Sequence, residues 1–299
     1  MQKREGLFDR GEVIMKKCAY CKHEKKLTIE HIFPSWIVRE QPDSNARFSL
    51  NEQRVTERVP TIRDVCGDCN SGQLAYLDNY VLGLYQRYFS KSVPEKGVIF
   101  EYDYDLLARW LLKVVYNSAR KTKSRPDELE EMINYILGKS PRVVNLRIIG
   151  FLLKPSKLSQ RMLRKLGEDY QGPITFAPRN VSITRMSFVL QGGSIVLMGR
   201  AVLLNSYCFV IVNVPEGLDR TVRRRMMSEL TDQFAKKFGD ITVIDPRFKK
   251  VTLLMSNMDL IEMKRDSLTI FKDAYDDYYR RREAKKPSAL TNERFATKK

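Results

Sequence analysis

The chain of 299 residues is poor in histidine, with two, and in tryptophan, also with two. A helix that crosses a membrane needs about 20 continuous apolar residues. The chain has no such run, since Arg200 interrupts the apolar stretch from Ser194 to Leu204. The first residues, MQKREGLFDRGEV, have no apolar segment behind their charges, so we expect no secretory signal. These absences predict a cytoplasmic protein without membrane contact, whose five cysteines are not paired in disulfides.

Glycine and proline are also scarce, at 15 and 12 residues, which excludes a collagen-like or low-complexity chain. We find no Gly-rich phosphate loop, no nucleophile elbow and no internal repeat in the sequence. Hydrophobic residues make up 43% of the chain, which is too many for a disordered protein. The length predicts about two folded domains.

Acidic residues are outnumbered, with 36 Asp and Glu against 53 Lys and Arg, so the net charge is +17. Residues 1–92 are nearly balanced, at 15 basic and 12 acidic, while the remainder has 38 and 24. A basic excess of this size indicates an anionic partner, either nucleic acid or an acidic membrane surface. We expect basic residues of the later region to contact phosphates. Its tyrosines Tyr275, Tyr278 and Tyr279 either stack on bases or pack a helix.

Four of the cysteines form two Cys-x-x-Cys pairs, separated by 44 residues. Four thiolates suit a tetrahedral zinc ion, whereas a thioredoxin-like redox site needs a single pair. The sequence therefore predicts a structural zinc site; the alternative is four free thiols. Its ligands would be Cys18, Cys21, Cys66 and Cys69. The fifth cysteine, Cys208, lies in an apolar run and is expected in the core.

An acid–histidine pair follows the first cysteine pair, and an asparagine follows the second directly. In this arrangement the sequence resembles the HNH endonuclease family, in its zinc-containing branch that includes endonuclease VII. The resemblance covers roughly residues 14–80. The matching residues are Cys18, Cys21, Glu30, His31, Pro34, Cys66, Cys69 and Asn70.

The resemblance implies a treble-clef ββα-metal module, in which a β-hairpin and a helix hold one catalytic Mg²⁺ or Mn²⁺ ion. It assigns Glu30 and Asn70 as oxygen ligands of that ion and His31 as the general base that activates water. Gln73, one helical turn after Asn70, is a candidate contact to the phosphate or to the metal-bound water. The family's middle asparagine is absent from residues 60–65, and Asn70 replaces the more usual final histidine.

Side chains near this constellation have simpler interpretations. We expect His23 to be an exposed loop residue. Phe33 and Trp36 either stack on bases or, as we prefer, pack the core of the module. Apolar residues recur at helical spacing from 70 to 89, so we expect a helix whose N-terminus carries Asn70 and attracts a phosphate.

Hydrophobic periodicity predicts an α+β fold in which a larger domain with an antiparallel sheet follows the zinc module. Helices are expected over 103–121, 126–137, 218–238 and 258–285. Strands are expected over 143–153, 181–190, 194–204, 207–214, 241–244 and 251–255, with turns at 191–193 and 205–206 that make a β-meander. We divide the chain into a nuclease module at 1–92, a basic DNA-binding or regulatory domain at 93–286 and a polar, disordered tail at 287–299.

The resemblance predicts a metal-dependent DNA endonuclease that leaves a 5′-phosphate and a 3′-hydroxyl, working as an anti-phage defence or restriction effector. RNA as substrate stays open, as does a homodimer or a regulatory partner. One alternative is a zinc protein that binds nucleic acid without cutting it. Another is a sensor whose C-terminal domain controls the nuclease.

Overall fold

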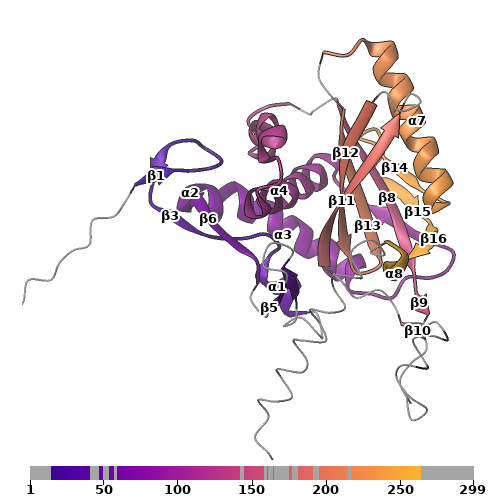
Figure 1. The fold of residues 1–299 in the computed structure, drawn as a ribbon. Helices are drawn as coiled ribbons and strands as arrows, with labels where there is room; N and C mark the ends of the chain where they lie inside the picture. Colours follow the sequence, from indigo (N-terminus) through magenta and orange to yellow (C-terminus); the bar gives the residue numbers. More distant parts are fainter. Residues whose placement is uncertain are drawn as a thin grey trace, which may run out of the picture.

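A computed structural model describes residues 15–40, 47–49, 54–56, 59–141, 145–157, 160, 164, 175–176, 181–190, 195–214 and 217–263. The turn expected at 191–193, the tyrosines at 275–279, the polar tail and most of the helix expected over 258–285 lie outside these residues. Helix α4 (Tyr104–Thr122) with the described elements of the first 92 residues, a β-sheet and helix α7 (Arg220–Phe238) form three successive layers (Figure 1). Among the described residues, no helix has the length and apolar character required to cross a membrane.

The middle layer is a six-stranded sheet in the order β11-β12-β13-β8-β14, with β16 paired to β8 in parallel. All other pairings in it are antiparallel, and β11, β12 and β13 follow one another along the chain, so the predicted meander is confirmed. The strands are β8 (Leu146–Lys154), β11 (Val181–Leu190), β12 (Ile195–Leu204), β13 (Tyr207–Asn213), β14 (Thr242–Ile244) and β16 (Met255–Asp259).

The sheet is apolar on both faces, which explains why its strands read as nearly continuous hydrophobic runs. Successive side chains of a strand point to opposite faces. In β8, Ile148 and Leu152 therefore join the core on the α4 side, while Ile149, Phe151 and Leu153 join the core on the α7 side. The sheet thus lies between two apolar cores.

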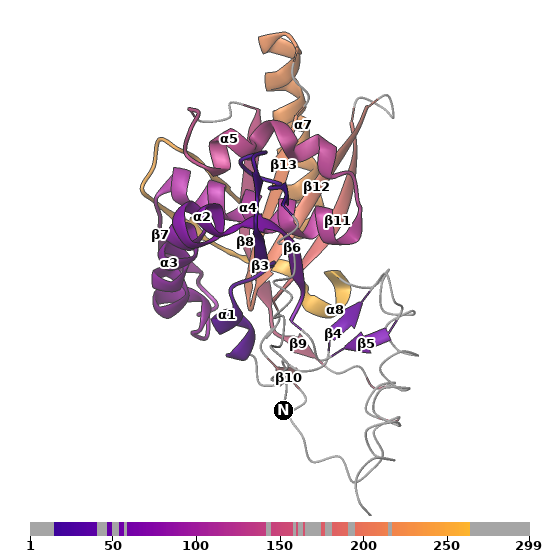
Figure 2. The ribbon, with the colours of Figure 1, turned by 90° about the vertical axis from the view of Figure 1, so that its left-hand side faces the viewer.

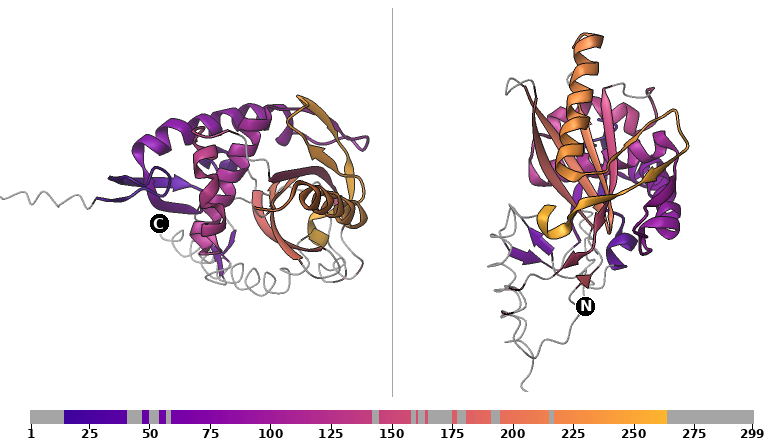
Figure 3. Two further views of the ribbon diagram at one scale, coloured as in Figure 1. Left: turned by 90° about the horizontal axis from the view of Figure 1, so that it is seen from above. Right: turned by 90° about the vertical axis from the view of Figure 1, so that its right-hand side faces the viewer.

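One long helix covers each face of the sheet. Helix α4 (Tyr104–Thr122) begins at Asp103, whose carboxylate accepts a hydrogen bond from the backbone N–H of Leu106. Helix α7 (Arg220–Phe238) begins at Asp219, which caps it in the same way through Thr221. Figure 2 shows α4 on one side of the sheet, and the right-hand view of Figure 3 shows α7 on the other. Both helices start and end close to the predicted positions.

Shorter elements complete the region after residue 92. They are β7 (Val98–Glu101), which pairs with β15 (Lys250–Leu253), the short helices η3 (Pro126–Met132) and α5 (Ile133–Ile136), and the pair β9 (Ser156–Lys157) and β10 (Thr175–Phe176). The expected helix start at Met258 is wrong: β16 continues to Asp259, and helix α8 (Leu260–Met263) begins after it. Pairing with β8 keeps these residues extended.

The described part of the first 92 residues forms small strands, a short helix and one long helical segment. The strands are β1 (Lys16–Lys17), β2 (Glu24–Lys25), β3 (Leu27–His31), β4 (Arg47–Ser49), β5 (Arg54–Thr56) and β6 (Thr61–Cys66). The helical segments are α1 (Ser35–Arg39), α2 (Gly67–Cys69), η1 (Asn70–Leu74), α3 (Ala75–Leu84) and η2 (Tyr85–Phe89). From Gly67 onward the chain stays helical to Phe89, with a kink at Gly72.

The antiparallel sheet and the mixed α+β composition agree with the predicted fold class, while the treble clef stays a prediction. The division at residue 92 also stays a prediction. One apolar core continues from Cys18 and Leu77 in the first region through Trp110 of α4 to Val202 of the sheet. The two regions therefore pack against each other without a break in the core.

Candidate metal centre and the strand pair beside it

Four cysteines from three places in the chain meet at one point. The β1–β2 turn supplies Cys18 and Cys21, the end of β6 supplies Cys66, and α2 supplies Cys69. Their sulfur atoms all lie within 4.8 Å of one another, and the sulfurs of Cys21 and Cys66 are 3.7 Å apart. Zinc–sulfur bonds of about 2.3 Å in a tetrahedron place sulfurs about 3.8 Å apart. The predicted cluster is confirmed, and it fits a zinc ion.

Backbone N–H groups point toward the sulfur of Cys18. The amide of Cys66 donates to it at 3.3 Å. Burial raises the pKa of the Cys18 thiol, but hydrogen bonds from the backbone of Cys66, Cys21 and Tyr20 outweigh burial and bring the pKa to about 7. Thiolates are the form that binds metal, so this backbone arrangement favours a metal ligand at Cys18.

A strand pair and the helix that follows it lie beside the cluster. Strands β3 and β6 pair antiparallel, with a bulge between Thr28 and Glu30. The side-chain amide of Asn70 donates from Nδ2 to Thr28 Oγ1 at 3.0 Å and to the carbonyl oxygen of Ile29 at 2.9 Å. Asn70 therefore joins the helix to β3 directly before Glu30 and His31.

Asn70 lies in the first turn of the helical segment and not at its N-cap. The segment begins three residues earlier, at Gly67, so the expected start at Asn70 is wrong. The cause is the extended backbone of Cys66, where β6 ends and the helix begins. Both hydrogen bonds of Asn70 use its nitrogen, and within the described chain no hydrogen bond reaches Oδ1, which leaves that oxygen for a ligand.

His31 ends strand β3 opposite Thr61 and is half-buried. In the described part of the chain its ring forms no hydrogen bond. Gln73 is half-buried in the same helical turn as Asn70. His23 is exposed, as expected. Phe33 is buried, and its ring centre lies 6.4 Å from that of Trp110. This confirms that Phe33 packs the core and does not stack on bases.

Glu30 is buried, at 4% exposure, and faces helix α4. Its Oε1 lies 2.9 Å from Lys113 Nζ and accepts a hydrogen bond from Asn117 Nδ2 at 3.2 Å. Burial raises the pKa of the Glu30 carboxyl, although Lys113 and Asn117 act in the opposite direction. An ion that binds Glu30 through Oε1 would have to share that oxygen with Lys113.

Lys113 is fully buried and contacts a second carboxylate. Its ammonium lies 2.7 Å from both oxygens of Asp78 on α3, and the indole N–H of Trp110 donates to the same side chain at 2.9 Å. Lys113 thus connects β3, α3 and α4 through a buried ion pair with Glu30 and a partly buried one with Asp78.

Asn117 and Arg120, further along α4, extend this network toward the cysteines. Tyr20, between Cys18 and Cys21, donates its hydroxyl to Asn117 Oδ1 at 2.7 Å. Arg120 pairs with Asp64 of β6 at 2.8 Å, and its guanidinium lies 4.0 Å from the ring centre of Tyr116. The side chain of Arg120 is therefore held by partners inside the molecule and is 10% exposed.

Sequence reasoning missed this network, although one signal was present. Lys113 follows Trp110 by three residues and Asn117 follows it by seven, which places both on the same face of α4 as that apolar residue. Polar residues on the apolar stripe of a helix indicate buried partners.

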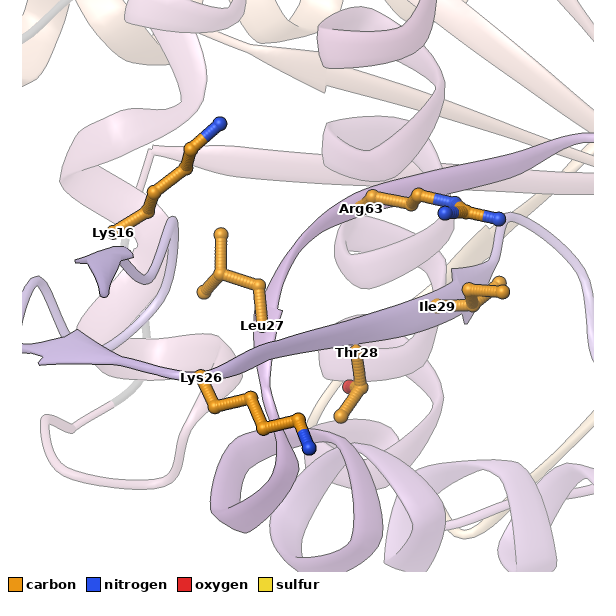
Figure 4. Close-up of a pocket in the computed structure, with 6 residues that line it drawn as sticks. All are labelled: Lys16, Lys26, Leu27, Thr28, Ile29 and Arg63. Carbon is orange, nitrogen blue, oxygen red and sulfur yellow. The ribbon is translucent and has the colours of Figure 1, made fainter. Parts of the chain in front are cut away.

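A basic hollow lies beside β3. It has a volume of about 370 Å³ and is lined by Lys16, Lys26, Leu27, Thr28, Ile29 and Arg63 (Figure 4). Thr28, which accepts the hydrogen bond from Asn70, connects this hollow to the strand pair.

Comparison of the chain with protein-family models, curated proteins and solved structures finds no match. The cysteine cluster, the strand pair and the hollow are therefore the features on which a function can be argued.

Proposed function

We propose that the protein is a DNA endonuclease of the HNH type, with a structural zinc ion and a divalent cation at its active site. The observation that supports it best is the hydrogen bonding of Asn70 to β3 next to Glu30 and His31, beside four cysteines that fit zinc. The HNH resemblance assigns these three residues to one active site. Zinc would hold the short strand pair in place.

The oxygen donors suit Mg²⁺ or Mn²⁺ by type. Within the described chain, Asn70 Oδ1 and Glu30 Oε2 accept no hydrogen bond and are the oxygens that could bind the cation. When bound, a divalent cation would neutralise negative charge on the phosphate and on the leaving oxygen.

His31 would act as the general base. Its imidazole would take a proton from water while the water oxygen bonds to phosphorus, and the bond from phosphorus to the 3′ oxygen breaks. The 3′ oxygen then takes up a proton, leaving a 5′-phosphate and a 3′-hydroxyl. An imidazole suits this step because its ordinary pKa of about 6.5 is close to neutral pH.

The experiment compares the two histidines of the chain. Purified protein is incubated with plasmid DNA and Mg²⁺ or Mn²⁺, alongside His31→Ala and the matched control His23→Ala. We expect His31→Ala to lower the cleavage rate by about 100-fold or more, because it removes the base, while His23→Ala cuts at the parental rate. Equal rates in both variants, or binding without cleavage by the parent, would contradict the proposal.

Binding without cleavage would instead support a zinc protein that only binds nucleic acid. The pairing of Glu30 with Lys113 favours this second candidate, since it occupies one carboxylate oxygen. If the protein cuts DNA only after a second molecule is added, the result would support control of the nuclease by the later domain.

A further inference from the structure

The hollow beside β3 gathers positive charge from two strands and from the residue between β2 and β3. Lys16 belongs to β1, Lys26 precedes β3 and Arg63 belongs to β6. All three side chains are exposed, and among the described residues no carboxylate lines the hollow. Figure 4 shows Lys26 and Arg63 on either side of the strand that carries Thr28 and Ile29.

These three cations have no acidic partner in the part of the chain that the structure describes. Within the described ranges, none of them forms an ion pair with a carboxylate, whereas the neighbouring Lys25 is paired with Asp68. Three unpaired cations around one depression repel each other, and an anion placed between them would remove that repulsion.

The floor of the hollow is partly apolar. Ile29 is 48% exposed, and Leu27 is half-buried next to it. A free phosphate ion has no use for apolar surface, whereas a phosphodiester carries a sugar on each side of its phosphate. The combination of cations with Ile29 therefore fits a strand of nucleic acid better than an isolated anion.

We propose that this hollow binds the backbone of a nucleic acid strand, with phosphates on Lys16, Lys26 and Arg63 and a sugar against Ile29. The inference rests on the proposed nuclease function and extends it, because it assigns a binding site for the DNA backbone next to the candidate active site. A strand rises about 3.4 Å per residue, so His31 lies about 7 Å along β3 from Ile29. A backbone held in the hollow would thus continue toward His31.

The test measures binding separately from cleavage. Fluorescence anisotropy with a labelled DNA duplex is recorded in the His31→Ala background, without added divalent cation and over a series of salt concentrations. The hollow variant combines Lys16→Gln, Lys26→Gln and Arg63→Gln. Its matched control removes the same charge at exposed sites elsewhere, through Lys91→Gln, Lys96→Gln and Lys139→Gln.

We expect the hollow variant to lose about tenfold or more in affinity and the control to lose clearly less. Each phosphate contact contributes about 0.9 to the slope of log affinity against log salt, so that slope should fall by about 1 to 3 in the hollow variant. Equal losses in both triple variants would overturn the proposal. If the parent protein does not cut DNA but the hollow variant still binds DNA more weakly than the control, the nuclease function is rejected and the hollow as a binding site is kept.

Two further measurements separate the sources of the phosphate. Ile29→Ser should weaken binding without changing the salt slope, since it removes apolar contact and no charge. Single-stranded DNA and RNA of the same sequence show which strand the hollow prefers. Competition by inorganic phosphate as strong as that by DNA, compared at equal phosphate content, would assign the hollow to a free anion and overturn the nucleic acid assignment.

Discussion

Lys113 is the residue on which the arrangement of the candidate site depends most directly. It is fully buried and lies between the carboxylates of Glu30 and Asp78. A buried ion pair is a weak source of net stability, because taking both charges out of water is costly. Removal of one partner is a different matter, since the remaining charge is then buried without compensation.

Replacement of Lys113 by Met should therefore lower the free energy of unfolding by about 3–5 kcal/mol. The matched control is Lys139→Met at an exposed position, which should change stability by less than about 0.5 kcal/mol. Denaturant unfolding measures both. Adding Glu30→Gln to Lys113→Met should restore part of the loss, because it removes one unpaired charge; a double variant no more stable than the single one would argue against the ion pair.

Single residues also show where sequence reasoning stops. The four cysteines could be predicted to meet, because the Cys-x-x-Cys spacing has few other uses. The burial of Glu30 could not be predicted, because its partner Asn117 lies 87 positions away in the sequence. An acid–histidine pair looks the same in the sequence whether the acid faces solvent or a buried lysine.

At the scale of elements, helices and strands with a clear period were predicted closely, and junctions were not. Helix α4 and strands β11 to β13 lie within a few residues of their expected bounds. The start of the helix at Gly67 and the strand through Asp259 were missed. In both places pairing or packing with distant segments decides where the element begins or ends, and the local hydrophobic period does not predict this boundary.

The turn before β7 requires glycine for two reasons. Gly97 has a φ of +91°, and a Cβ atom placed there would lie 2.5 Å from the carbonyl oxygen of Leu253 on β15. Gly217 has a similar φ of +80° but has no atom within 4 Å of that position. The two glycines therefore share a backbone conformation and differ in contact.

Gly217→Ala should cost about 1–2 kcal/mol, which is the penalty for a side chain in the left-handed region. Gly97→Ala should cost about 1–3 kcal/mol more, because β7 or β15 must shift to admit the methyl group. Thermal and denaturant unfolding of the two variants measure the difference. Equal losses of unfolding free energy in the two variants would mean that β15 leaves more room beside Gly97 than the 2.5 Å distance indicates.

At the scale of the whole molecule, the two faces of the sheet belong to different cores. The core that contains Cys66 also includes α4 and one face of the sheet, while Cys208 faces α7 on the other side. A change at the cysteine cluster should therefore reach the α4 side of the molecule before the α7 side.

Cys66→Ser should abolish binding of one zinc ion per chain and increase hydrogen exchange in β3, β6 and α4 more than in α7. Zinc content and exchange rates measure these effects. The matched control is Cys208→Ala, which removes a buried thiol from the other core and should keep the zinc. Retention of zinc by Cys66→Ser, or equal exchange in α4 and α7, would contradict the assignment.

The continuity of the core across residue 92 has a consequence for how this module can be transferred between proteins. A fragment that ends there would keep all four cysteines, yet it would lack the Lys113, Asn117 and Arg120 side chains that satisfy Glu30, Tyr20 and Asp64. It would also expose Leu77 and Leu84, which α4 and its neighbours cover. The cysteine cluster can thus not be transferred by itself: a host protein that received it would have to supply a helix equivalent to α4.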